Sequence, residues 1–292
     1  MIKIKVYRLN CKLIICSMLV ILIIISIFTY NGVKAQTDEY IEVPIIMYHS
    51  MLKSRSGSYI VHPSEFENDL KYIKENGYET INMTDLINFV YNGLELPEKP
   101  IIITFDDGHY NNLGYAVPLL KQYNMKAVIS IVGSYTDVYT KSDEANLNYG
   151  YLRWKDIQQL IEEGNIEFQN HTYNLHSITN GRKGCAKKSW ESVDEYKSLL
   201  AQDLVKLQNE FKENTNYEPN TFTYPYGAVS KESLNIIKEL GFKASLSCAS
   251  GINYITKNPD CLYQLKRNNR VSGVSTEKFF KNILKWQEKS IY

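Results

Sequence analysis

The stretch "KPIIITFDDGHY" (99–110) is a continuous apolar run that ends on two adjacent carboxylates and a glycine. A β-branched run without polar alternation is typical of a strand that is buried on both faces of a parallel sheet. Asp-Gly after such a run also marks a turn. A turn alone does not require two acids, so we expect a site in which one carboxylate binds a metal ion and its neighbour accepts a proton.

Similar apolar runs alternate with helical patterns through the rest of the chain. We expect strands at 43–48, 79–83, 126–133, 166–170, 221–225, 243–247 and 263–267, and helices at 62–78, 85–93, 113–124, 152–165, 190–213, 230–241 and from Thr276. Strands separated by helices indicate βα units and a parallel sheet. Because no linker or repeat interrupts this pattern, the prediction is an α/β fold with a single (β/α) barrel over 43–292.

The first 35 residues differ from this body in composition. They hold five basic residues and no acid, and they include the apolar run 13–29. We therefore expect a signal peptide cleaved after Ala35 or a retained membrane anchor at 1–35, a short linker at 36–42, and an exported body. That body has 28 basic and 32 acidic residues, which gives no support to nucleic-acid binding.

The body contains three cysteines, Cys185, Cys248 and Cys261, without a CxxC pair. This pattern excludes a disulfide framework and a zinc–thiolate site. The sequence allows either a Cys248–Cys261 bridge or free thiols.

Polar residues follow several of the expected strands, where the functional face of a barrel lies. They are His49, Asp106, Asp107, His171 and the segment "YPYG" (224–227). In "NHTYNLH" (170–176), two histidines five residues apart can converge only if the chain between them turns, because a helix or strand would point them in different directions. Two imidazoles and one carboxylate form a common ligand set for catalytic zinc.

Three motifs in this order, "TFDDG", "HTYNLH" and "YPYG", resemble the polysaccharide deacetylases of carbohydrate esterase family 4. The resemblance extends over about 43–288 and implies a distorted (β/α) barrel. It also implies that Asp106 is the general base and that Asp107, His171 and His176 bind the metal. Pro225 and Tyr226 would line the substrate groove, and the backbone N–H of Tyr226 would help to bind the oxyanion.

The chain departs from the common family pattern in three ways. The two metal-binding histidines are five residues apart instead of four, Thr223 stands where an arginine often orients the base, and no histidine follows His176 to supply the acid. Because "PIIMYHS" begins the domain, the chain looks like the circularly permuted branch that includes the poly-N-acetylglucosamine deacetylases. That resemblance implies that His49 is the general acid. We expect its ring near the metal, on the side away from Asp106, and the missing arginine could be Arg267 or Arg270.

The remaining candidates have weaker support. His109 adjoins the motif and could contact substrate, whereas His62 looks like a surface residue at a helix start. Asn170 and Thr172 could orient His171. Trp154 and Trp190 match apolar helical stripes, which predicts core packing.

We therefore expect an exported, monomeric, metal-dependent hydrolase that removes N-acetyl groups from N-acetylglucosamine residues of a cell-envelope or extracellular polysaccharide. The metal would be one divalent ion, with Zn²⁺ favoured by the ligand types and Co²⁺ or Ni²⁺ as alternatives. The other two hypotheses are a carbohydrate O-acetyl esterase and a catalytically silent glycan-binding module.

Overall fold

The computed structural model describes residues 18, 20–22 and 40–288. The chain divides into two units, Met1–Glu39 and Tyr40–Tyr292. The expected export segment 1–35 lies outside the described residues except for 18 and 20–22, so it stays a prediction. Among the residues that the structure describes, no helix is both long enough and apolar enough to cross a bilayer.

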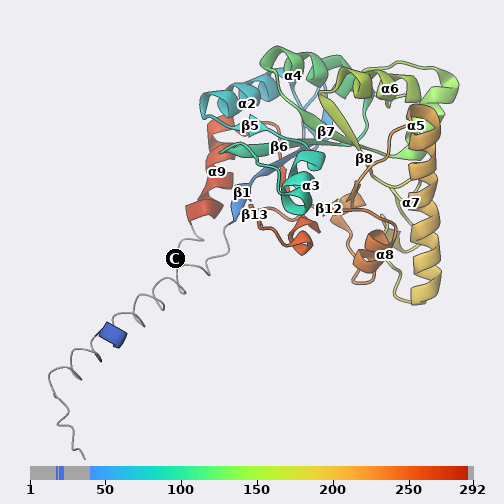
Figure 1. The fold of residues 1–292 in the computed structure, drawn as a ribbon. Coiled ribbons are helices and arrows are strands. Elements are labelled where there is room, and N and C mark those ends of the chain that lie inside the picture. The colour runs from blue at the N-terminus through green and yellow to red at the C-terminus, as the bar shows by residue number, and fades with distance from the viewer. Residues whose placement is uncertain (1–17, 19, 23–39, 289–292) are drawn as a thin grey trace, which may run out of the picture. The chain divides into compact units, whose positions relative to one another are not determined.

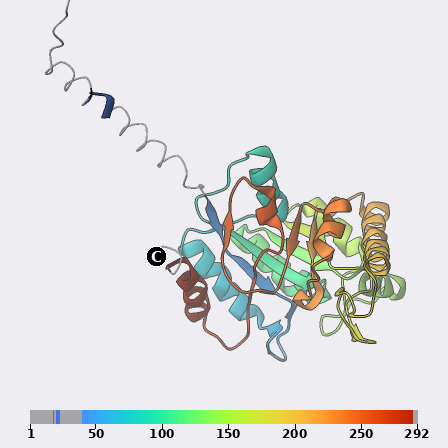
Figure 2. The same cartoon turned by 90° about the horizontal axis from the view of Figure 1, so that it is seen from below.

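The main sheet of the Tyr40–Tyr292 unit is parallel and curled (Figures 1 and 2). Its strands, in spatial order, are β12 (Ala244–Leu246), β11 (Thr221–Thr223), β8 (Ile166–Asn170), β7 (Ala127–Ile131), β6 (Pro100–Asp107), β2 (Ile45–Tyr48) and β14 (Asn268–Asn269), with β5 (Glu79–Thr80) also paired to β6. A parallel bridge between Leu246 and Leu265 connects β12 to the segment that precedes β14. The predicted α/β fold with one distorted barrel is confirmed.

Strand β6 explains why the opening apolar run has no polar alternation. Ile101, Ile103 and Phe105 pack in the cluster that contains most of the surrounding helices, whereas Ile102 packs on the opposite face with other strand residues and with the helix at 83–92. Successive side chains of a strand point to opposite faces, so both faces of β6 are covered. The same alternation turns Asp106 toward the face of Ile102, at the carboxyl end of the strand.

Most helices cover the outer side of the curled sheet, whereas the helix at 83–92 packs with the inner face that carries Ile102 (Figure 1). They are α2 (Pro63–Glu75), α3 (Met83–Asn92), α4 (Val117–Tyr123), α5 (Gly133–Ser142), α6 (Trp154–Glu163), α7 (Val193–Thr215), α8 (Ser233–Glu239) and α9 (Thr276–Glu288), with shorter turns η1 (Asn112–Ala116), η2 (Pro225–Gly227) and η3 (Pro259–Leu262). Helix α5 was not expected from the sequence. The expected strand at 263–267 is wrong, because only the Leu265 bridge forms there.

Capping residues set the helix starts that periodicity misplaced. Ser192 caps α7 in a capping box, so this helix begins at Val193 rather than at Trp190. The prediction of core packing is therefore wrong for Trp190, which is 71% exposed, and correct for Trp154, which is 5% exposed. His62 caps α2 through its ring nitrogen.

Three two-stranded sheets complete the fold. They are β1 (Ile41–Val43) with β13 (Asn253–Ile255), β3 (Ser50–Met51) with β4 (Ile60–Val61), and β9 (Ile178–Thr179) with β10 (Arg182–Lys183). Cys185, Cys248 and Cys261 are free thiols, so the Cys248–Cys261 bridge does not form.

Candidate metal centre

The two adjacent carboxylates at the end of β6 face different partners. Asp106 is almost fully buried and receives two hydrogen bonds from Arg267, Nη1 to Oδ1 at 2.6 Å and Nη2 to Oδ2 at 2.8 Å. Burial alone would raise the pKa of Asp106, but the charge of Arg267 and its hydrogen bonds hold this pKa below the ordinary value. Asp106 is therefore an ionised carboxylate at neutral pH.

Arg267 answers the question that the sequence left between two arginines. Arg270 binds Asp69 instead, with Nε 2.7 Å from Oδ2, and this pair lies between α2 and the chain before α9. Thr223, which stands where the family often has an arginine, bonds to Ser130 through its hydroxyl. The arginine that contacts the candidate base thus comes from the segment that closes the sheet.

Asp107 faces both histidines of the "HTYNLH" segment. Its Oδ1 atom lies 3.5 Å from His171 Nε2 and 3.1 Å from His176 Nε2, and one potential ligand atom from each residue lies within 4.8 Å of the others. Oδ1 is buried and has no hydrogen-bond donor that satisfies normal geometry. A buried acceptor without a donor, next to two imidazole nitrogens, fits a divalent cation.

The electrostatics of this cluster favour an anionic Asp107. Burial opposes ionisation, yet the neighbouring His109, His171 and His176 hold the pKa of Asp107 well below its usual range. Burial lowers the pKa of His176, but Asp107 outweighs that effect and raises it. Both shifts have the same cause, because positive charge close to the Asp107 carboxylate is favourable.

The chain positions these side chains through residues with positive φ that lie at the end of a strand or shortly after it. Asp107 (φ 71°), Thr172 (φ 72°) and Tyr226 (φ 57°) are non-glycine residues in a region of backbone space that usually favours glycine. Gly108 has φ 75°, and a Cβ there would lie 2.9 Å from Ile131 Cγ2. Such strain concentrates at functional sites, where the surrounding structure holds it in place.

One ring nitrogen of His171 is fixed by the backbone. Its Nδ1 lies 2.8 Å from the carbonyl oxygen of Thr223 at the end of β11 and donates to it, so Nε2 is the ring nitrogen that faces Asp107. Asn170 accepts from Thr172 N at 2.9 Å and thereby supports the turn after His171. Neither Asn170 nor Thr172 hydrogen-bonds to the His171 ring, so the expectation that they orient it stays a prediction.

His49 lies beside Asp106. Its Nε2 is 3.9 Å from Asp106 Oδ2, so the expectation that its ring lies away from Asp106 is wrong. Burial lowers the pKa of His49 despite the nearby Asp106 and Asp107, and its buried Nδ1 has no protein partner among the described residues. The exposed ring of Tyr59 packs against it, with the ring centres 4.8 Å apart.

Aromatic residues pack against His176 and His109. Tyr226 follows Pro225 in η2, and its ring centre lies 4.7 Å from that of His176. His109 stacks on Tyr151 at 4.9 Å, and its Nε2 lies 3.4 Å from Asp107 Oδ2. His109 therefore contacts a candidate metal ligand, a role that its position in the sequence did not reveal.

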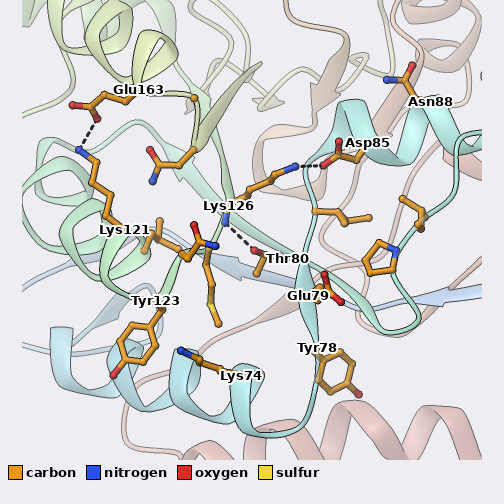
Figure 3. A pocket seen from close by; sticks show the side chains of 18 of the residues that line it. Lys74, Tyr78, Glu79, Thr80, Asp85, Asn88, Lys121, Tyr123, Lys126 and Glu163 are labelled. Carbon is orange, nitrogen blue, oxygen red and sulfur yellow. Dashed lines mark hydrogen bonds and ion pairs between the residues drawn. The ribbon is translucent and has the colours of Figure 1, made fainter.

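A cavity of about 1010 Å³ lies away from this centre (Figure 3). Its lining includes residues that precede β7 and β8, at the amino ends of the strands. Two ion pairs occupy its wall, Lys121–Glu163 at 2.8 Å and Lys126–Asp85 at 2.9 Å. The polar residues of the candidate site instead follow the strands, so the cavity and the site lie at opposite ends of the barrel.

The chain is similar in sequence to proteins named as N-deacetylases. It is 24% identical over 251 residues to a poly-β-1,6-N-acetyl-D-glucosamine N-deacetylase of Escherichia coli, and the match covers 79% of this chain but only 36% of that protein. It is 25% identical over 190 residues to the enzyme of that name in Staphylococcus aureus, covering 65% of this chain and 61% of the relative.

Two solved structures share the fold. The de-N-acetylase from Aggregatibacter actinomycetemcomitans matches with a TM-score of 0.71 at 22% identity, covering 84% of this chain and 100% of that chain. IcaB from Ammonifex degensii matches with a TM-score of 0.67 at 21% identity, covering 84% and 97%. The polysaccharide deacetylase family model matches residues 93–245, just over half of the sequence, and the chain therefore belongs to the polysaccharide deacetylase family.

Proposed function

We propose that the protein is a metal-dependent hydrolase that removes N-acetyl groups from N-acetylglucosamine residues of a polysaccharide. The observation that supports this proposal most directly is the cluster of Asp107, His171 and His176, with its buried, donorless Oδ1. The names of the relatives support the amide substrate, since those proteins are N-deacetylases of poly-β-1,6-N-acetyl-D-glucosamine.

Asp107, His171 and His176 would hold the cation, and their oxygen and nitrogen ligands favour Zn²⁺ over other divalent ions, with Co²⁺ and Ni²⁺ as alternatives. When bound, the cation supplies positive charge that polarises the amide carbonyl and makes water a stronger acid. Both effects lower the barrier to attack by water on the acetyl carbon.

Asp106 has the properties of the general base in this reaction. Arg267 keeps its carboxylate ionised and fixes its orientation, so an oxygen of Asp106 can accept the proton of the attacking water. His49, 3.9 Å away, would donate a proton to the leaving nitrogen from its protonated form, which the charges of Asp106 and Asp107 favour and burial opposes. The C–N bond then breaks, and acetate and the free amine of the sugar are the products.

Pro225 and Tyr226 would form one wall of the substrate groove. Tyr226 is 40% exposed beside His176, which suits packing against a sugar ring. The left-handed turn at Tyr226 would direct its backbone N–H toward the developing oxyanion. We further propose that the protein acts outside the cytoplasm, on the basis of the apolar run 13–29.

The test is acetate release from defined glycans, namely poly-β-1,6-N-acetylglucosamine, chitin oligomers and peptidoglycan, with and without chelator and with Zn²⁺, Co²⁺ or Ni²⁺ restored. We expect amide hydrolysis that chelation abolishes. The double variant His171→Ala, His176→Ala should lose metal by elemental analysis, whereas Asp106→Asn should keep metal and lose turnover. Release from O-acetylated substrates alone would favour an esterase, and glycan binding without any acetate release would favour a silent binding module.

A further inference from the structure

The loop that holds both candidate histidine ligands must turn sharply, and its backbone is clamped on one side by α5. Gly133 N donates to Thr172 O at 3.1 Å, and Ser134 N donates to Tyr173 O at 2.8 Å. A Cβ on Gly133 would lie 2.7 Å from Tyr173 Cδ2, so the approach of α5 to the loop requires glycine. These contacts fix the carbonyl groups of the turn but leave its amide groups to find other partners.

Helix α7 supplies those partners through one carboxylate. Asp203 accepts hydrogen bonds from two consecutive backbone amides, Tyr173 N to Oδ1 at 2.7 Å and Asn174 N to Oδ2 at 2.8 Å. Hydrogen bonds to an ionised acceptor are roughly twice as strong as those between neutral groups. The carboxylate thus fixes the midpoint of the segment between His171 and His176.

The same helix also holds the start of the loop. Asn170 Nδ2 donates to Leu204 O at 3.2 Å and to Gln208 Oε1 at 3.1 Å, where α7 passes the carboxyl end of β8 (Figure 1). Asp203 is therefore part of a continuous contact between α7 and the loop. It contacts neither histidine directly, so any effect on the metal must pass through the backbone.

We propose that Asp203 is a positioning residue for the metal centre, whose carboxylate holds the Tyr173–Asn174 turn that brings His171 and His176 to Asp107. This inference rests on the metal-dependent function proposed above. Two imidazoles five residues apart share one cation only while the chain between them keeps this turn. Loss of the carboxylate would leave two amides without their acceptor and would let the histidines separate.

Glu210 provides a matched control on the same helix. It is a carboxylate with a buried Oε2 that has no partner, and its Oε1 lies 3.9 Å from Lys206. Within the described residues, Glu210 makes no hydrogen bond to the loop at 171–176. Glu210→Gln and Asp203→Asn are therefore the same chemical change on one helix, and only the second touches the loop.

The experiment measures Zn²⁺ affinity by competition with a chromophoric chelator, the visible spectrum of the Co²⁺-loaded protein, and thermal unfolding of the metal-free protein. Asp203→Asn can still accept one of the two hydrogen bonds, whereas Asp203→Ala accepts none and keeps a good helix former in α7. Second-sphere partners of a metal site are typically worth 10- to 100-fold in affinity. We expect a loss of roughly 10-fold for Asp203→Asn, a larger loss for Asp203→Ala, and an altered Co²⁺ spectrum in both.

Glu210→Gln should keep Zn²⁺ affinity within about two-fold and leave the Co²⁺ spectrum unchanged. The variant His171→Ala distinguishes a failure of the metal-site assignment from a failure of the role proposed for Asp203. If it binds Zn²⁺ as tightly as the native chain, the metal site itself is wrongly assigned. If it loses Zn²⁺ while both Asp203 variants keep native affinity and spectrum, the role of Asp203 is wrong and the metal site stands. An equal loss in Glu210→Gln would also overturn the role, because it would show a general effect of altering α7.

Discussion

Replacement of Arg267 by methionine should destabilise the protein and stop catalysis without removing the metal. The side chains of Arg267 and Asp106 are 0% and 3% exposed, so water cannot screen a carboxylate that loses its partner. Within the described residues, the carboxylate of Asp106 accepts hydrogen bonds from Arg267 and from no other side chain. Leaving one member of a buried ion pair without its partner typically costs about 3–5 kcal/mol.

Arg270 is the matched control, because it is also buried and also bound to an aspartate. Asp69, however, accepts two further hydrogen bonds, from Tyr48 Oη at 2.9 Å and from Thr276 Oγ1 at 2.6 Å. Arg270→Met should therefore reduce the free energy of unfolding by less, about 2–3 kcal/mol. It should leave acetate release largely intact, since Arg270 does not contact Asp106.

Urea unfolding gives these free energies, and a double-mutant cycle isolates the pair. Arg267→Met and Asp106→Asn should each be destabilising, whereas the double variant should be more stable than Arg267→Met alone, because it no longer buries an unpaired charge. Arg267→Met should also lower kcat by roughly 100-fold, since the general base is no longer oriented. A cycle without coupling, or an Arg270→Met variant whose kcat falls as much as that of Arg267→Met, would refute this role for Arg267.

Three further perturbations test other parts of the site. His49→Ala should lower kcat for amide hydrolysis by roughly 100-fold. An ester with a good leaving group needs less protonation, so its kcat should fall less. Equal losses on the two substrates would exclude His49 as the general acid. Gly184→Ala places a Cβ 2.8 Å from Pro225 O and should reduce acetate release, whereas Gly241→Ala, at φ 91° with no atom within 4 Å, should only lower thermal stability. Burial raises the pKa of Glu210 from 4.5 to about 7, so the fold loses stability as pH rises from about 4.5 to about 7, and above 7 the loss is complete. Glu210→Gln should therefore raise the free energy of unfolding by about 1 kcal/mol at pH 8 and by little at pH 5, and an equal gain in urea unfolding at both pH values would contradict this cause.

The strands, the helices and their order along the chain could be predicted from the sequence, because they depend on residues that are close together in it. The unbroken apolar run before Asp106 required a strand covered on both faces, and the alternation of such strands with helical stripes required a parallel sheet. Because the carboxyl ends of parallel strands meet at one edge, the motifs that follow those strands could be assigned to one site from their positions in the chain. Local periodicity was less reliable at helix ends, where the cap at Ser192 decided that Trp190 is exposed.

Which distant side chains meet depends on tertiary packing. Arg267 and Asp106 are 161 positions apart, and only the closure of the sheet between Leu246 and Leu265 brings Arg267, rather than Arg270, to the carboxylate. Asp203 lies beside the apolar stripe of a long helix, and no local pattern distinguishes it from a solvated acid until α7 docks on the metal loop. Hydrogen bonds and ion pairs between remote segments depend on how closely those segments pack, and a periodic pattern in one segment contains no information about the position of another.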